Sequence, residues 1–284
     1  MRIDAHHHVW ELATYAQTWM NPAQSAHIGR DFHMAEWAEE AEPLGITRSI
    51  LVQTVAMRQE TLDFLSLAVT TPSICGVVGW IETDAQDIDA QVADLLAHPS
   101  SIKMVGLRDL TVYRPEPDWA ISPSADRFFR LCGRLSLTVD LLLRPDQVAS
   151  AASAAHSNPD VRFVLNHLGN PDFDTTTPDQ WERAIRPFAS APNTAIKLSG
   201  IATFAGAPSR VEEQLPAYLH SALTCFGANR VMFGSDWPVS RTRMTYSQMV
   251  SLVERAMSRL SPAESRMIWS ETATEWYRLE ETTA

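Results

Sequence analysis

Short apolar runs alternate with segments of helical spacing along this chain, and that alternation limits its fold more than any other feature. The runs are rich in leucine and β-branched residues, as expected for strands buried on both faces of a parallel sheet. The segments between them carry apolar residues every three or four positions, for example at Trp181, Ile185 and Phe188. We predict strands at Ile3 to Val9, Ile50 to Val55, Ile74 to Ile81, Ile102 to Leu107, Leu137 to Leu143, Val161 to Leu165, Ala195 to Leu198 and Val231 to Gly234.

Strands that alternate with helices need crossover connections, and crossover connections produce a parallel sheet. Eight such units within 284 residues are typical of a closed (β/α)8 TIM barrel, with its site at the C-terminal ends of the strands. An open doubly wound sheet would favour a Gly-x-Gly-x-x-Gly turn after the first strand, where this chain has His-Val-Trp-Glu. No change in composition marks a linker, so we expect residues 1–284 to form one barrel domain. The helices after Thr177 and Ser261 should begin with a capping residue followed by proline.

The composition argues against several kinds of partner. Acidic residues outnumber basic ones by 34 to 23, and a net charge of −11 repels nucleic acid and anionic membrane surfaces. The chain has no apolar run of about 18 residues, and it begins with Met-Arg-Ile-Asp-Ala-His, unlike a signal peptide. Its three cysteines are widely spaced, which is typical of neither a disulfide framework nor a zinc ribbon. We therefore expect a cytoplasmic protein with a small-molecule ligand, and a homo-oligomer is compatible with the sequence.

Polar side chains end most of the predicted strands, where a barrel of this kind builds its active site. Burying an ionisable group beside an apolar run costs free energy unless the group is paired with another charge or binds a ligand. The pattern therefore predicts one site assembled from many strands. The residues at these ends are His6 and His8, Gln53, Trp80, Arg108 with Asp109, Asn166 with His167, Lys197 with Ser199, and Asp236.

His6 and His8 are two positions apart in a strand, so their side chains should face the same side, with Asp4 one step deeper on that side. Two converging imidazoles polarise a carbonyl group, either by holding a divalent cation or by donating hydrogen bonds. A chance run of histidines is the alternative. His167 is either a third member of this group or a hydrogen-bonded core histidine. Asp236 is either a general base acting on water or the cap of the following helix.

Three further residues are predicted to bind substrate. Arg108 is either a bidentate clamp for a carboxylate or sugar hydroxyl, or the partner of Asp109 or Asp140 in an ion pair. Trp80 is one of three tryptophans expected at this rim, where they form a wall for a ring or pack in the core. Lys197 ends the seventh predicted strand and is assigned to the substrate as well.

Five motifs together resemble the amidohydrolase superfamily, and within it the amidohydrolase-2 branch. That branch contains sugar lactonases such as L-fuconolactonase and L-rhamnono-lactonase, and also 2-pyrone-4,6-dicarboxylate lactonase. The resemblance runs from residue 2 to about residue 279, where Glu275 to Leu279 is similar to the family's closing helix. The motifs are Ile3-Asp4-Ala5-His6-His7-His8-Val9-Trp10, Val105-Gly106-Leu107-Arg108, Leu165-Asn166-His167-Leu168-Gly169-Asn170-Pro171, Lys197-Leu198-Ser199-Gly200 and Met232-Phe233-Gly234-Ser235-Asp236-Trp237-Pro238.

The resemblance implies that His6, His8 and His167 surround the scissile carbonyl or a metal ion, that Asp236 is the general base, and that Arg108 binds substrate. Metal-dependent relatives usually add a ligand at the end of the fourth or fifth strand, where this chain has Arg108-Asp109 and Leu143-Arg144. The branch also includes lactonases that work without a metal. One divalent ion held by the three histidines and Asp236, most suitably Zn²⁺, and a metal-free site are therefore both compatible with the resemblance.

The expected activity is hydrolysis of a lactone of a sugar acid or a related small hydroxy acid, in carbohydrate metabolism. Asp236 would take a proton from water and return it to the departing ring oxygen. Two alternatives remain open at the level of sequence. One is a metal-dependent nonoxidative decarboxylase of an aromatic or muconate-type acid, and the other is a barrel that binds a sugar acid without catalysis.

Overall fold

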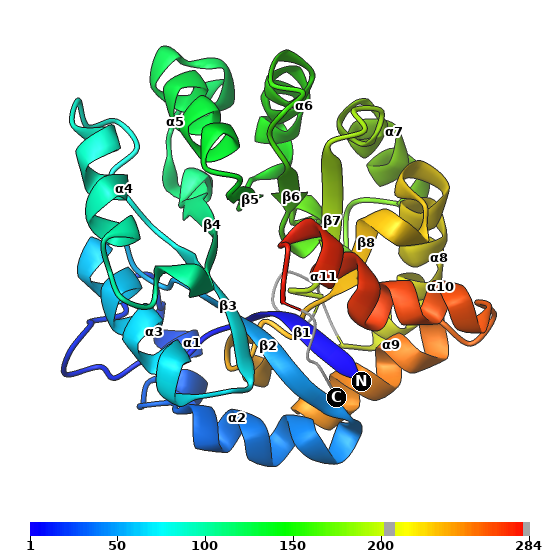
Figure 1. Ribbon diagram of the computed structural model, residues 1–284. Coiled ribbons are helices and arrows are strands. Elements are labelled where there is room, and N and C mark those ends of the chain that lie inside the picture. Colours follow the sequence, from blue (N-terminus) through cyan, green and yellow to red (C-terminus); the bar gives the residue numbers. More distant parts are fainter. Residues whose placement is uncertain (202–207, 281–284) are drawn as a thin grey trace.

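The computed structural model describes residues 1–201 and 208–280, and it confirms the predicted TIM barrel (Figure 1). Within these residues eight parallel strands pair in chain order, each with the next. The backbone N–H of His8 donates to the carbonyl of Trp237 at 2.7 Å, and the N–H of Asp236 donates to the carbonyl of His6 at 2.8 Å, so the first strand also joins the segment after the last. The strands are β1 (Arg2–His7), β2 (Ile46–Val52), β3 (Ile74–Gly79), β4 (Met104–Asp109), β5 (Thr138–Leu141), β6 (Phe163–Leu165), β7 (Thr194–Leu198) and β8 (Val231–Phe233).

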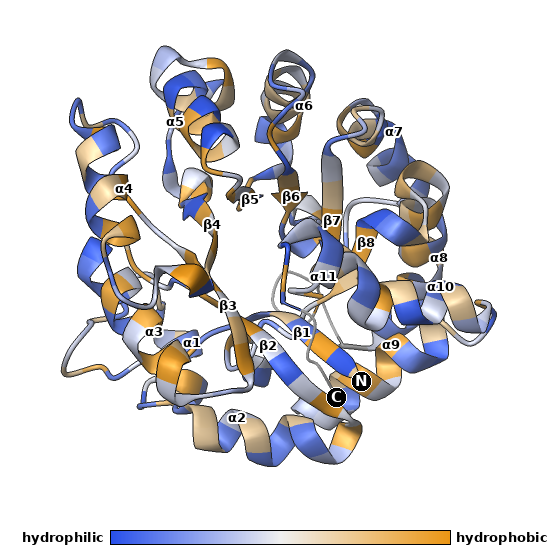
Figure 2. Cartoon of the chain, in the orientation of Figure 1, coloured by the Kyte–Doolittle hydropathy of each residue, from blue (hydrophilic) through white to orange (hydrophobic). Residues whose placement is uncertain are grey.

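Helices cover the outside of the barrel, and Figure 2 shows hydrophobic and hydrophilic residues interleaved along them, as expected for helices that bury one face. The caps predicted at Thr177 and Ser261 are present, since each hydroxyl accepts a hydrogen bond from the backbone N–H three residues later. No helix in the described part of the chain combines the length and apolar character that a membrane span requires. The α-helices are α1 (Pro22–Ile28), α2 (Met34–Ala41), α3 (Arg58–Thr70), α4 (Ile88–Leu96), α5 (Pro123–Arg134), α6 (Val148–Ser157), α7 (Pro178–Ala189), α8 (Pro208–Phe226), α9 (Tyr246–Ala256), α10 (Pro262–Arg266) and α11 (Thr272–Trp276).

The apolar side chains form two cores. The larger core lies between the strands and the surrounding helices. The smaller core combines alternate strand residues such as Ile50, Val164 and Met232 with Trp276 and Leu279 from the end of the chain. The segment around α11 therefore closes one end of the barrel, and the polar strand ends lie at the other.

Three sequence predictions about the strands need correction. The second strand lies nearer the N-terminus than predicted, since it runs from Ile46 to Val52 rather than from Ile50 to Val55. Ile102 does not begin β4, because it lies in a short turn before the strand and is 74% exposed. Asp4 does not share a side with His6 and His8, because the β1–β2 register is irregular between Asp4 and His7. Its carboxylate instead accepts hydrogen bonds from Trp37 of α2 at 3.2 Å and from Tyr246 of α9 at 2.9 Å.

Candidate active site

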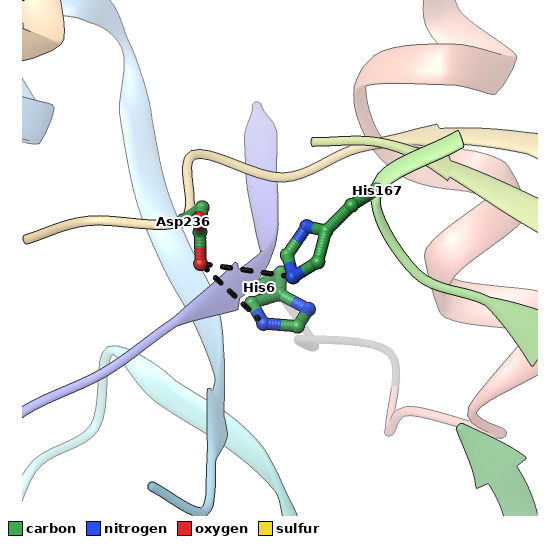
Figure 3. A group of neighbouring side chains, drawn as sticks. All are labelled: His6, His167 and Asp236. Atoms are coloured by element: carbon green, nitrogen blue, oxygen red, sulfur yellow. Dashed lines mark ion pairs between the residues drawn. The ribbon is translucent and has the colours of Figure 1, made fainter. Parts of the chain in front are cut away.

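Three histidines and one aspartate converge where β1, β6 and β8 end. Oδ1 of Asp236 lies 3.8 Å from Nε2 of His6, 3.4 Å from Nε2 of His8 and 3.8 Å from Nε2 of His167. The Nε2 atoms of His6 and His8 are 3.2 Å apart. All four side chains are buried, and Figure 3 shows His6 and His167 directed at the same carboxylate oxygen. The structure thus brings the four predicted catalytic residues into one group.

The backbone is bent sharply at two of these residues. His167 and Asp236 have φ angles of +54° and +55°, in the left-handed region. That region costs L residues roughly 1–2 kcal/mol, and such strain is concentrated at functional sites. Gly200, with φ +62°, lies directly against His167, and a Cβ at this position would come within 2.6 Å of the ring. The packing therefore leaves His167 little freedom to move.

Hydrogen bonds behind the cluster fix the histidine rings. Nδ1 of His8 lies 2.8 Å from the carbonyl oxygen of Val52, which can only accept, so Nδ1 carries a proton and the neutral ring presents the lone pair of Nε2 to the cluster. Nδ1 of His167 lies 2.9 Å from Oγ of Ser199, and that oxygen also accepts the backbone N–H of His167. Contacts of this kind orient imidazoles that bind metals or move protons.

Arg108 ends β4 and is buried beside the cluster. Its Nη1 lies 3.4 Å from Nε2 of His6 and 3.4 Å from Oδ1 of Asn166, while Nη2 donates to the carbonyl of Gln53 at 2.5 Å. Burial lowers the pKa of the Arg108 guanidinium, although Asp140 and other acids nearby oppose that shift. The guanidinium is therefore held in place mainly by neutral acceptors and keeps its charge available to a ligand.

Lys197 lies beneath His6, inside the barrel. Its Nζ lies 2.6 Å from Oδ2 of Asp140 and 3.4 Å from Nδ1 of His6. Asp140 also accepts hydrogen bonds from Nδ2 of Asn166 at 3.0 Å and from the hydroxyl of Tyr277, which reaches in from the end of the chain. Burial, and next the charge of Lys197, lower the pKa of His6 well below its ordinary value. His6 is therefore neutral at physiological pH.

A cavity of about 130 Å³ opens above this group. The polar part of its wall includes His8, Arg108, His167 and Asp236. The remaining lining side chains come largely from loops and are Trp19, Gln24, Thr54, Leu110, Tyr113, Leu142 and Val239.

Two residues predicted to bind substrate are not in that wall. Lys197 is buried below it, and Trp80 does not line it. Asp109 is also turned away, because its carboxylate pairs with Arg114 at 2.8 Å. Sequence reasoning missed Trp19 and Thr54, although the unusual length of the segment from residue 10 to residue 34 was a signal for the first of them.

The cluster has the composition of a metal site. One ligand atom from each of His6, His167 and Asp236 lies within 4.8 Å of the others. Ligand atoms about 2.1 Å from a tetrahedral Zn²⁺ ion are roughly 3.4 Å apart, and the separations around Oδ1 of Asp236 are 3.4 to 3.8 Å. Imidazole nitrogens with one carboxylate oxygen are a usual donor set for zinc, so these residues fit such an ion.

Two proteins named L-fucono-1,5-lactonase are similar to this chain. The one from Burkholderia ambifaria is 29% identical, with 98% of this chain and 96% of that protein covered. The one from Burkholderia multivorans is 31% identical, with 99% and 97% covered. A crystal structure of an amidohydrolase from Burkholderia multivorans with bound zinc is 30% identical and superposes with a TM-score of 0.91, over 99% of this chain and all of that one.

More distant structures share the fold alone. A 2,6-dihydroxybenzoate decarboxylase from Rhizobium is 13% identical, with a TM-score of 0.67 over 98% of each chain. The decisive comparison is with sequence families, where the amidohydrolase family matches residues 3–279. Because that match covers nearly the whole chain and agrees with the motifs at the strand ends, this protein belongs to the amidohydrolase family.

Proposed function

We propose that the protein hydrolyses a lactone of a sugar acid or a related small hydroxy acid. The observation that carries this proposal is the position of Asp236, whose carboxylate lies in a cavity wall within 3.8 Å of three imidazoles. A carboxylate in this setting can take a proton from water beside groups that polarise a carbonyl. The two similar proteins named L-fucono-1,5-lactonase support the same reaction class.

In the proposed reaction, Asp236 accepts a proton from water as the oxygen of that water bonds to the lactone carbonyl carbon. The resulting oxyanion is stabilised by the nearby positive charge of Arg108, which lines the same cavity. The bond between the carbonyl carbon and the ring oxygen then breaks. Asp236 returns its proton to that oxygen, and the product is the open hydroxy acid.

His6, His8, His167 and Asp236 are proposed to hold one divalent ion, which when bound would polarise the carbonyl as a Lewis acid. The hydrogen bond from Nδ1 of His8 to the carbonyl of Val52 supports a ligand role, because in the neutral ring it leaves the lone pair on Nε2 directed at the cluster. Burial lowers the pKa of His167 to about 4, so this ring is also neutral and able to serve as a ligand at physiological pH. Arg108 and Lys197 approach His6 closely, and their charges should weaken the hold on a cation.

The charge of the cavity favours an uncharged substrate. Among the described residues that line it, Arg108 is the only cation and Asp236 the only carboxylate. A dicarboxylate or muconate-type acid would need several cationic partners to offset the desolvation of its charges. An uncharged lactone needs none, and its hydroxyl groups can find partners in Gln24 and Thr54. The charges of the lining side chains therefore favour a lactone over a dicarboxylate substrate.

The test is a panel of aldonolactones that includes L-fucono-1,5-lactone, with proton release followed in weak buffer. Asp236→Asn should lower kcat by about 10²–10⁴-fold, the range of general acid–base catalysis. Asp179→Asn changes an exposed carboxylate in the first turn of α7 and serves as the matched control. Full activity in Asp236→Asn would refute the assignment of the base.

Elemental analysis before and after chelation tests the metal. Zinc bound in a one-to-one ratio, and lost together with activity on chelation, would support the ion. Unchanged activity after complete metal removal would indicate that Arg108 and the imidazoles polarise the lactone carbonyl without an ion. Carbon dioxide release from aromatic acids would instead indicate a decarboxylase. A thermal shift on adding sugar acids, with no product from any lactone, would indicate a binding protein.

A further inference from the structure

A second hollow adjoins the reaction cavity. It has a volume of about 480 Å³, against about 130 Å³ for the inner cavity. Four residues line both spaces, namely Trp19, Thr54, Leu110 and Tyr113. We call this second space, which Thr18, Val55 and Ala56 also line, the outer groove. The two spaces therefore adjoin along these four residues, and a molecule bound beside Asp236 lies next to the outer groove.

The outer groove differs from the inner cavity in chemistry. Its described lining contains no charged side chain, and its polar groups are the hydroxyls of Thr18, Thr54 and Tyr113 and the indole N–H of Trp19. Two aromatic rings form part of a wall that is otherwise mostly aliphatic. Such a surface binds apolar groups by excluding water, and it has nothing to pair with an ionised group.

Tyr113 is held in this position by a well-anchored loop. Its side chain is 61% exposed, which is unusual for a large aromatic residue. The residue after it, Arg114, pairs with Asp109 at 2.8 Å and with Asp84 at 2.6 Å. From the other side, Nη1 of Arg144 donates to the carbonyl of Val112 at 2.9 Å. The exposure of Tyr113 is thus a fixed property of the folded chain.

Trp19 is fixed in a similar way. Its indole N–H donates to Oε1 of Gln17 at 2.8 Å, and its ring meets Trp10 edge to face with centroids 5.9 Å apart. Gln17 is itself buried and donates to the carbonyl of Tyr15 at 3.1 Å. Both aromatic walls are therefore held by contacts that do not involve a ligand, as in a preorganised binding site.

The inner cavity is too small for more than one ring. It is comparable to the engineered cavity of roughly 150 Å³ that holds one benzene molecule. We propose that the outer groove is a subsite for an apolar substituent on the lactone ring, which packs against Trp19 and Tyr113. This inference rests on the proposed lactonase activity and extends it from a single ring to a lactone with an apolar side chain.

The expected effect can be estimated from the transfer of methylene groups out of water. Full burial of one methylene corresponds to about fourfold in kcat/KM, and partial burial in an open groove to about twofold. A series of δ-lactones with no substituent, a propyl group and a pentyl group should therefore show a rising kcat/KM. The measured quantity is the slope of log kcat/KM against chain length, so a change in rate on the parent lactone does not disturb the comparison.

Two matched variants locate the effect. Ala56→Trp places a large side chain at an exposed position in the groove wall, and it should abolish the slope. Met57→Trp adds an indole one position later, at a 48% exposed side chain outside that wall, and it should keep the slope. A flat series in the unmodified protein, or the same slope in Ala56→Trp, would overturn the subsite.

Failure of the proposed function would be distinguishable from failure of the subsite. If no lactone is hydrolysed, the open hydroxy acids of the same series are titrated by calorimetry. Affinity that rises with chain length in the unmodified protein and in Met57→Trp, but not in Ala56→Trp, would support the subsite without any turnover. Affinity independent of chain length would overturn it.

Discussion

Gly200→Ala would test whether the position of His167 controls the reaction. The Cβ of alanine would lie 2.6 Å from Cγ and Nδ1 of His167, whereas ordinary contacts begin at 3.4 Å. The ring must therefore retreat by about 0.8 Å, or the loop must shift by as much. Such a movement pulls Nδ1 away from Ser199 and Nε2 away from its place beside Asp236. A misplacement of about 1 Å can cost 10²-fold in rate, and we expect kcat/KM for the lactone to fall by about that factor.

Gly45→Ala is the control for backbone strain. Gly45 has φ +75°, and a Cβ there would meet no atom within 4 Å. Both variants should therefore lose roughly 1–2 kcal/mol of the free energy of unfolding through backbone strain, and Gly200→Ala should lose more because its Cβ also overlaps His167. Urea titration measures these losses of stability, and initial rates of proton release measure the loss of rate expected only in Gly200→Ala. If the two variants kept equal rates, the reasoning about His167 would be refuted.

The remaining predictions concern buried charges. Lys197→Met should lower the free energy of unfolding by about 3–5 kcal/mol, because it leaves the carboxylate of Asp140 buried without its cation. Adding Asp140→Asn should restore part of that loss in urea titration, because it removes the unpaired charge and keeps an amide oxygen as acceptor beside Asn166 and Tyr277, and a further loss would contradict this account. Burial raises the pKa of Glu60 to about 7 from an ordinary value of 4.5, although its carboxylate accepts backbone N–H groups of Thr54 and Val55. The folded protein thus binds a proton more tightly there than the unfolded chain, so stability should decline as pH rises from 4.5 through 7. Glu60→Gln should remove this decline from a plot of Tm against pH, and an unchanged plot would show that another group titrates.

The fold could be predicted because the spacing of apolar residues along the chain indicates which faces of each strand and helix are buried. Runs such as Ile74 to Ile81 contain no charged residue, and strands covered on both faces are the usual way to bury such runs. The prediction failed at residues whose type suits a buried strand or a strand end but whose backbone is not in that conformation. Ile102 is apolar but exposed in a turn. Asp4 faces the outer helices because a register irregularity breaks the two-residue alternation, and no pattern in the sequence marks that irregularity.

The site was predictable only to the extent that strand ends define it. His6 lies near the end of β1, while His167 and Asp236 follow β6 and β8, and the barrel brings such positions together wherever they lie in the chain. Asp140 was expected only as a possible partner of Arg108, whereas it pairs with Lys197, and that pairing depends on which strand residues face inward. Trp19 and Thr54 lie on loops, whose reach over the barrel depends on their own hydrogen bonds rather than on periodicity.

The residues of the cluster come from distant parts of the chain, so the protein can be divided into two fragments that each carry part of the site. A cut in the connection between α4 and β4, near Pro99, would leave His6 and His8 on one fragment, with His167 and Asp236 on the other. Neither fragment alone could assemble the group, because the hydrogen bonds that close the barrel between the segments at His6 and Asp236 would then have to form between two molecules. Recovery of turnover on mixing would report reassembly of the barrel, and fusing each fragment to one of two interacting proteins would turn that recovery into a sensor of their association.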